Sequence, residues 1–184
     1  MINGWIMLNK PKGFTSNYCV NFIKKKFHIK KIGYAGTLDP LATGLLPLAI
    51  GESTKSIKYF ETLDKTYFFT SVWGKETTTL DDEGKIINRS NVIPTKADLQ
   101  KIIKKFIGNI EQKPPNYSAI KINGVRAYNL ARKGIEFDVK PKKVSIYNIK
   151  VVNHNSSINQ TSFLLKCSKG CYVRSLTRDI AREL

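Results

Sequence analysis

The pattern of apolar and polar residues predicts short strands and short helices in alternation. The apolar run Gly4–Leu8 ends at the turn-like segment Asn9–Gly13, which predicts a strand followed by a tight loop. Thr15 or Ser16 can then cap a helix whose last turn is basic. We expect the apolar face of this helix to comprise Cys19, Val20, Phe22, Ile23 and Phe27.

The next segment has no helical or strand periodicity. Residues 32–44 (IGYAGTLDPLATG) combine glycines, a proline and small side chains, a composition that predicts a structured loop. A buried strand is expected at Leu45–Ile50. A helix that begins at Ser53 or Thr54 would then direct Ile57, Phe60 and Leu63 inward.

The middle of the chain predicts one strand and the clearest helix. Lys65–Trp73 is rich in Thr and aromatic residues, and alternation places Tyr67, Phe69 and Ser71 on one face. Residues 77–84 form a polar excursion. Thr95 can cap a helix whose apolar face comprises Leu99, Ile102, Ile103, Phe106 and Ile107.

The last third begins with a rigid segment, because two successive prolines in Gln112–Tyr117 fix the backbone and remove donors. A short helix is expected to end at Gly134. Two strands follow, at Val144–Val152 and Thr161–Cys167, and a helix begins near Tyr172. The chain ends inside that helical pattern, so we expect it to be a fragment.

Charge is the first indication of a partner. The chain holds 31 Lys and Arg against 14 Asp and Glu, a net charge of +17 that attracts polyanions. Nucleic acid is the leading candidate, with an anionic membrane surface as a weaker one. Nucleotide bias in the genome, with many lysines serving only as solvated surface, explains the composition equally well.

The cysteines and the lengths of the apolar runs bear on the cellular compartment in which the protein is expected. Cys19, Cys167 and Cys171 form an odd set without C-x-x-C spacing, so neither a disulfide framework nor a zinc site is indicated. The sequence contains neither a signal-peptide pattern nor eighteen consecutive apolar residues. We therefore expect a cytoplasmic protein without a membrane partner. His28 and His154 match no functional motif.

Within the loop at residues 32–44, Asp39 is the candidate catalytic residue. It lies in Gly36–Pro40 (GTLDP), where glycine and proline restrict the backbone on both sides, and a rigid loop suits a nucleophile or a base. A turn-capping aspartate is the commoner fate of such a residue, and local composition alone favours it.

The longer segment around Asp39 favours a catalytic role over a turn-capping one. Gly33–Leu46 (GYAGTLDPLATGLL) closely resembles the catalytic motif of the bacterial tRNA pseudouridine-55 synthases, the TruB family. Four further segments resemble the family's motifs in the family's order, and with the first they cover nearly the whole chain: Leu8–Gly13 (LNKPKG), Lys65–Tyr67 (KTY), Pro114–Lys121 (PPNYSAIK) and Cys167–Arg174 (CSKGCYVR).

The resemblance implies a reaction and three catalytic residues. Asp39 would attack the target uridine, so that the base leaves C1′, turns and rejoins through C5. No metal and no redox cofactor is implied, because atoms are only rearranged. Arg174 would keep the carboxylate ionised through a bidentate pair. Tyr67 would stack on the extruded base and take part in proton removal at C5. Without the motifs, a phosphate-contacting or surface Arg174 and a packing Tyr67 are ordinary alternatives.

The resemblance also implies RNA contacts. Unstacking a uridine in a folded arm requires binding elsewhere, and the region after the two prolines corresponds to a mobile loop that closes on the RNA stem. Solvated helix surface is the alternative for any one of its basic side chains. The implied substrate-binding residues are Lys10, Tyr34, Lys121, Arg126, Arg132 and Tyr172, and Lys133 belongs to the same basic cluster. Many family members have His where this chain has Tyr34, which keeps a flat polar ring but no imidazole.

The expected fold is the family's α+β fold, a mixed, mainly antiparallel sheet with flanking helices and a central active-site cleft. We expect residues 1–184 to form one catalytic domain, truncated before the family's usual C-terminal RNA-binding domain of the PUA type. The substrate implied is uridine 55 in the TΨC arm of tRNA, acted on by a monomer. A non-catalytic RNA-binding module and a guide-RNA-dependent synthase are the alternatives.

Overall fold

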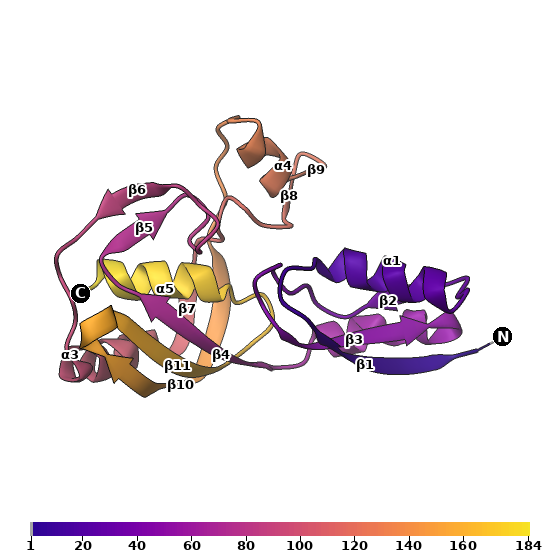
Figure 1. Ribbon diagram of the computed structural model, residues 1–184, viewed down its shortest axis with the longest axis horizontal. Coiled ribbons are helices and arrows are strands. Elements are labelled where there is room, and N and C mark those ends of the chain that lie inside the picture. Colours follow the sequence, from indigo (N-terminus) through magenta and orange to yellow (C-terminus); the bar gives the residue numbers. More distant parts are fainter. Residues whose placement is uncertain (1) are drawn as a thin grey trace. The chain divides into compact units, whose positions relative to one another are not determined.

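The computed structural model describes residues 2–184, whose helices and strands group into two units, Met1–Leu63 and Asp64–Leu184. The first unit is built on a three-stranded antiparallel sheet of order β1-β3-β2 (Figure 1). Its elements are β1 (Gly4–Lys10), α1 (Ser16–Lys26), β2 (Ile32–Tyr34), β3 (Gly44–Ile50), the 3-10 helix η1 (Gly51–Ser56) and α2 (Ile57–Glu61).

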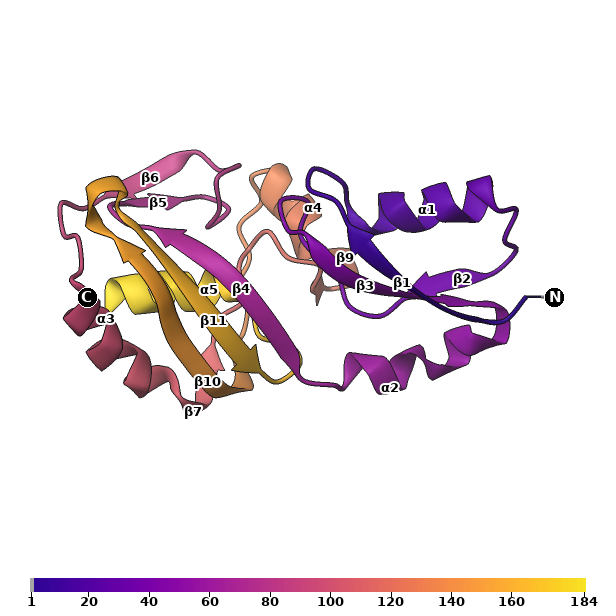
Figure 2. The same cartoon turned by 60° about the horizontal axis from the view of Figure 1, so that its bottom comes forward.

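The two faces of this sheet carry different helices. Figure 2 shows α1 on one side and α2 on the other. Toward α1, alternate residues of β1 and β3 form the core of the unit, with Leu46 and Leu48 almost fully buried against Cys19 and Val20. On the opposite face Trp5 packs against Phe60 of α2, with ring centroids 4.0 Å apart and ring planes inclined by 30°.

Helix α1 begins as predicted, since the Thr15 hydroxyl accepts a hydrogen bond from the Tyr18 amide. The predicted burial of two phenylalanines is wrong: Phe22 is 53% exposed and Phe27 is 62% exposed. Phe22 lies about 200° around the helix from the buried Val20, and Phe27 already stands at the C-cap. A three-stranded sheet covers only the narrow stripe on the other side of the helix.

The second unit is built on a four-stranded antiparallel sheet of order β4-β11-β10-β7, with two small hairpins, β5-β6 and β8-β9. Its strands are β4 (Lys65–Val72), β5 (Lys75–Thr77), β6 (Ile86–Arg89), β7 (Gly108–Gln112), β8 (Lys121–Ile122), β9 (Val125–Arg126), β10 (Lys142–Asn155) and β11 (Gln160–Cys167). Its helices are α3 (Lys96–Ile102), α4 (Ala127–Arg132) and α5 (Val173–Arg182), with 3-10 turns η2 (Ile103–Phe106) and η3 (Ser156–Ile158).

The core of the second unit lies between the sheet and helices α3 and α5. Leu176 and Ile180 of α5 are fully buried in one cluster with Phe163 and Leu165 of β11. The predicted alternation of β4 is confirmed: Tyr67, Phe69 and Ser71 are half-buried or buried, while Thr66, Phe68 and Thr70 are exposed. Strand β4 therefore presents Tyr67 to the helix-covered side of its sheet.

The helix around Leu99 is shorter than its periodicity suggests. Thr95 caps it in a full capping box with Asp98, as predicted. The α-helix ends at Ile102, η2 follows, and Ile107 is exposed beyond both, so its predicted place on the apolar face is wrong. The chain there becomes β7, which exists because it pairs with the start of β10.

Two other expected elements differ in form. The predicted loop 32–44 opens with the three residues of β2, which are recruited by pairing with β3. The helix expected from Ser53 or Thr54 begins as the 3-10 turn η1 and becomes α-helical only at Ile57. The expected α+β class is confirmed, and every strand pair in residues 2–184 is antiparallel. Within this range no helix combines the length and apolarity needed to cross a membrane.

Candidate functional site

The loop that carries Asp39, residues 35–43, joins β2 to β3, and we call it the catalytic loop after the family motif that its sequence resembles. Asp39 is exposed near its tip, and the Ala42 amide donates to the Asp39 carbonyl at 3.0 Å. Gly36 adopts a φ of +81°, a left-handed conformation that favours glycine. The Gly13 amide donates to the Pro40 carbonyl at 2.8 Å, which joins this loop to the one after β1.

Lys10, the last residue of β1, fixes the same two loops from inside. Its side chain is 0% exposed, and Nζ donates to the carbonyls of Phe14 at 2.7 Å, Pro11 at 3.0 Å and Pro40 at 3.3 Å. Burial lowers the pKa of Lys10, whereas the charge of Asp39 acts in the opposite direction. Lys10 thus lies in the electrostatic field of Asp39 while its donors serve the backbone.

Ser16, at the start of α1, holds the residue before Asp39. Its hydroxyl accepts from the Leu38 amide at 3.0 Å and donates to the Leu38 carbonyl at 3.1 Å. Ser16 is almost fully buried, so both bonds are shielded from water. From the sequence Ser16 is predicted only as a possible helix cap, because nothing local relates positions 16 and 38.

Tyr34 ends β2 immediately before the catalytic loop. It is half-buried and packs against the core of the first unit. The ring therefore stands at the base of the loop that carries Asp39, where the resemblance implied a substrate-binding residue.

In the second unit Arg174 lies in the first turn of α5 and joins two segments. Its guanidinium donates to the Thr79 carbonyl at 2.8 Å and to the Tyr117 carbonyl at 3.0 Å, and it pairs with Asp81 at 3.4 Å. Both side chains of this ion pair are mostly buried. Arg174 therefore orders the polar excursion after β5 and the proline-containing segment together.

Asp81 is a residue that sequence reasoning missed. One carboxylate oxygen accepts from the Thr79 hydroxyl and from the Glu83 amide, and the other faces Arg174. In the sequence it belongs to a run of Thr, Asp and Glu that is typical of a solvated turn. The neighbouring Asp82 is exposed, so composition alone does not distinguish the two.

The start of α5 is pinned at Tyr172 by the buried Gln112. The Gln112 amide group accepts from the Tyr172 backbone amide at 2.7 Å and donates to its carbonyl at 3.2 Å. One turn later the Ser175 hydroxyl donates to the Lys113 carbonyl at 2.8 Å. The end of β7 thereby sets the position of the helix that carries Arg174.

Tyr67 stands on β4 opposite Leu165 of β11 and is half-buried against the core of the second unit. This position explains why the Tyr67 ring packs against the core. The structure therefore brings Tyr67, Tyr172 and Arg174 into the second unit, whereas Lys10, Tyr34 and Asp39 belong to the first.

The basic segment, residues 121–134, comprises the hairpin β8-β9 and helix α4, which stand away from the four-stranded sheet in Figure 1. Lys121, Arg126 and Arg132 are all exposed or half-exposed. Arg126 donates to the Ala119 carbonyl, and the guanidinium of Arg132 lies 5.6 Å from the centroid of the Tyr128 ring. These side chains leave donors and charge on the surface, as contact with phosphates requires.

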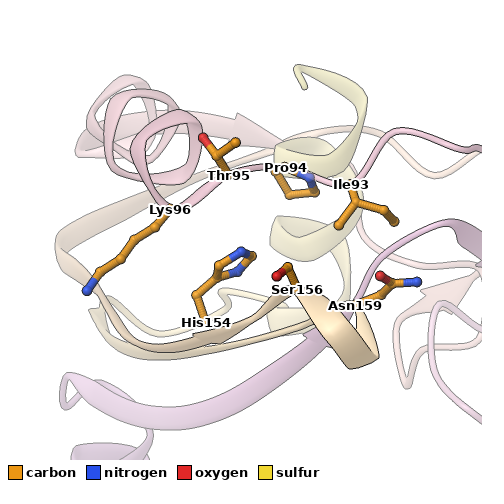
Figure 3. Close-up of a pocket in the computed structure, with 7 residues that line it drawn as sticks. All are labelled: Ile93, Pro94, Thr95, Lys96, His154, Ser156 and Asn159. Atoms are coloured by element: carbon orange, nitrogen blue, oxygen red, sulfur yellow. The ribbon is translucent and has the colours of Figure 1, made fainter.

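A surface pocket of about 500 Å³ lies elsewhere in the second unit (Figure 3). It is lined by Ile93, Pro94, Thr95, Lys96, His154, Ser156 and Asn159. His154 lies in β10, and its Nδ1 is 2.8 Å from the Thr161 hydroxyl. These lining residues include no carboxylate and no thiol, so the pocket offers no nucleophile of the predicted kind.

Two cysteines of the second unit interact with each other. Cys167 and Cys171 share a hydrogen bond that raises the pKa of the buried Cys167 and lowers the pKa of Cys171. Within residues 2–184 no group of three or more His, Cys, Asp or Glu is placed to hold a metal ion.

Solved structures of other proteins share the fold of this chain. The chain aligns over 98% of its length with 44% of a chain in a structure described as a Cbf5-Nop10-Gar1 complex, at a TM-score of 0.71 and 28% identity. It aligns similarly with 43% of a chain in an H/ACA RNP bound to a substrate RNA containing 2′-deoxyuridine, at a TM-score of 0.68 and 25% identity. The chain therefore shares its fold with a chain in each of these two solved structures, the second of which contains RNA.

Sequence comparison identifies the family to which the chain belongs. A family model described as TruB family pseudouridylate synthase (N terminal domain) matches residues 24–173. The whole chain is 46% identical to 59% of the tRNA pseudouridine synthase B of Caulobacter vibrioides. It is 48% identical, over 98% of its length, to 61% of the enzyme of the same name from Ehrlichia ruminantium. The chain belongs to the TruB family and spans about three fifths of the length of these relatives.

Proposed function

We propose that this protein isomerises uridine to pseudouridine at position 55 in the TΨC arm of tRNA, with Asp39 as the nucleophile. The observation that carries the proposal is the support of Asp39: the residue is exposed, while the backbone on either side of it is held by the buried Lys10 and Ser16. Membership of the TruB family and the names of the relatives supply the reaction class.

The reaction balances without a redox partner. The Asp39 carboxylate attacks C1′ as the N1–C1′ bond breaks, and the released base turns. C5 then attacks C1′, which breaks the Asp39–C1′ bond and restores the carboxylate, and finally C5 loses a proton and N1 gains one. An exposed carboxylate is accessible to an extruded nucleotide, and docking of the RNA must then exclude the water around it.

The other assigned residues serve binding and charge. We propose that Tyr67 stacks on the extruded base and takes part in proton removal at C5, and that Arg174 supplies a permanent positive charge. Tyr34 and Tyr172 would contact the substrate, and Lys10 would act as a positioning residue, since its ammonium group is used by three carbonyls.

The basic segment would hold the RNA. Lys121, Arg126 and Arg132 are surface cations that can neutralise phosphates of the TΨC stem, an interaction that supplies affinity and orientation without reading sequence. We propose that the protein acts as a cytoplasmic monomer. A single-species mass in light scattering with and without tRNA tests the oligomeric state.

The decisive experiment replaces Asp39 by Asn and measures pseudouridine by carbodiimide mapping of a tRNA transcript. Product formation should fall by at least about a thousandfold, because a residue that forms the covalent bond has no substitute. Affinity for tRNA should be retained, since the shape of the loop is kept. Asp82→Asn, an exposed aspartate of the second unit, is the matched control and should remain active.

Retained turnover in Asp39→Asn would refute the assignment of the nucleophile. Binding of tRNA without any pseudouridine, in both the unaltered chain and the Asp82→Asn control, would instead indicate a non-catalytic RNA-binding module.

A further inference from the structure

The outer face of α1 carries a line of aromatic rings that the core does not use. Phe14, Tyr18 and Phe22 are 41%, 51% and 53% exposed. Tyr18 and Phe22 lie one helical turn apart on the same face of α1, about 6 Å along its axis, and Phe14 precedes the Thr15 N-cap. The buried side of the helix is formed by Cys19 and Val20 instead.

The rings are mutually aligned. Phe14 and Tyr18 have centroids 4.9 Å apart and planes inclined by 21°, and Tyr18 and Phe22 have centroids 6.5 Å apart and planes inclined by 19°. The ammonium group of Lys26 lies 5.9 Å from the Phe22 centroid and continues the line. We call Phe14, Tyr18 and Phe22 the aromatic ladder.

The segment that carries the aromatic ladder is basic. Asp39 is the first acidic residue of the chain, so residues 1–38 carry lysines without a single Asp or Glu. A surface pocket of about 650 Å³ lies at the C-terminal end of α1, lined by Asn21, Lys24, Lys25, His28, Ile29 and Lys30. A partner that covers this face must therefore offer both flat apolar surface and negative charge.

We propose that the aromatic ladder and the lysines at the end of α1 form a second RNA-binding surface, which takes unpaired nucleotides. Bases stack on near-parallel rings irrespective of sequence, and phosphates pair with lysines, the combination used by proteins that bind single strands. The inference rests on the proposed function only in taking RNA as the partner. It adds a surface for a single-stranded part of the substrate, distinct from the catalytic loop and the basic segment.

Charge favours this partner over the alternatives. A second copy of the chain would bring the same uncompensated lysines to the contact, which opposes docking of two such faces. A neutral apolar protein surface would cover the rings but leave Lys24 and Lys25 without counter-charge. A nucleic acid supplies the ring faces and the counter-charge in one polymer.

The test measures fluorescence anisotropy of labelled oligouridylate, which has no stem, with the full chain. In Tyr18→Leu and Phe22→Leu the side chain stays apolar but loses its aromatic face. Each should weaken binding about fivefold, as expected for the loss of one stacked base. Tyr59→Leu is the matched control: Tyr59 is 64% exposed in α2 of the same unit and has Lys58 5.1 Å from its ring, yet it stands outside the aromatic ladder.

A second measurement addresses the lysines. Replacing Lys24 and Lys25 by Gln should reduce the slope of log affinity against log salt by about 0.7 for each phosphate that the protein no longer neutralises. The slope of Tyr18→Leu should stay unchanged, because stacking releases no counterions. Thermal melts followed by circular dichroism should match the unaltered chain for every variant, since all these side chains are exposed.

Oligouridylate affinity that is equal in Tyr18→Leu, Phe22→Leu and Tyr59→Leu would overturn the proposal. It would equally be overturned if the leucine variants changed only self-association in light scattering, or only binding to vesicles of anionic phospholipid. The assay involves no turnover, and Asp39→Asn alters no residue of α1. Failure of the aromatic ladder and failure of the proposed reaction are therefore separate results.

Discussion

The catalytic loop and the basic segment are both proposed to contact RNA, yet they are held in opposite ways. The side-chain bonds that fix the catalytic loop come from distant positions, 30 residues away for Lys10 and 22 for Ser16. In the basic segment the bond from Arg126 reaches only 7 residues, and α4 packs mainly against its own hairpin.

The difference matches the proposed role of each region. A nucleophile must be placed within a fraction of an ångström of the bond that it attacks, so bonds to the rest of the unit are an advantage. Phosphate contacts act through charge at longer range and tolerate displacement. A segment with few buried contacts opens at low free energy, which suits a surface that must admit a folded RNA.

The largest effect is expected when Lys10, which fixes the catalytic loop, is replaced by Met. Three carbonyls lose their donor, so we expect the free energy of unfolding to fall by about 2 kcal/mol. Displacement of the catalytic loop should lower turnover about a hundredfold. Denaturant unfolding and carbodiimide mapping measure the two. Lys12→Met, two residues along and exposed, is the control, and equal behaviour of both variants would contradict a buried clamp.

Replacing Arg132 by Gln should have a smaller effect of a different kind. Removal of one phosphate contact should weaken tRNA binding about fivefold and reduce the salt slope by about 0.9, with kcat unchanged. Arg132→Lys should keep most of the affinity, because a point charge suffices for this contact. A fall in kcat at saturating tRNA would instead show that the basic segment acts in the chemical step.

Removing the cap of α3 changes the stability through a residue that belongs to neither region. Thr95→Ala deletes the hydroxyl that accepts from the Asp98 amide at 3.2 Å, and it should lower the free energy of unfolding by about 1 kcal/mol. Turnover of the folded protein should not change, and Thr95→Ser should restore the stability. Reduced turnover in Thr95→Ala would mean that the loss of activity in Lys10→Met is not specific to the catalytic loop.

The smallest effect concerns pH. Burial lowers the pKa of Lys10, so the folded chain releases this proton at a lower pH than the unfolded chain, whose lysine has the ordinary value of 10.5. The unfolded state then binds more protons, and raising the pH toward 10.5 stabilises the folded state. The stability of the unaltered chain relative to Lys10→Met should rise with alkaline pH. Asp39→Asn should lower the pKa of Lys10 further, because an attractive charge is lost.

Local signals were enough to predict several elements of this protein from its sequence. The Thr15 and Thr95 caps, the alternation of β4 and the short helix before Gly134 depend on neighbours within a few residues, and the structure has them as predicted. The motif around Asp39 also identified the family, since a long exact order of residues is more specific than periodicity.

Long-range packing, by contrast, settled which residues support that motif and which side chains reach water. Strands β2 and β7 form because β3 and β10 offer them partners, and Lys10 is buried because two loops close over it. Phe22 is exposed because the sheet beneath α1 is narrow. Each of these depends on groups distant in sequence, so no local pattern carries the information.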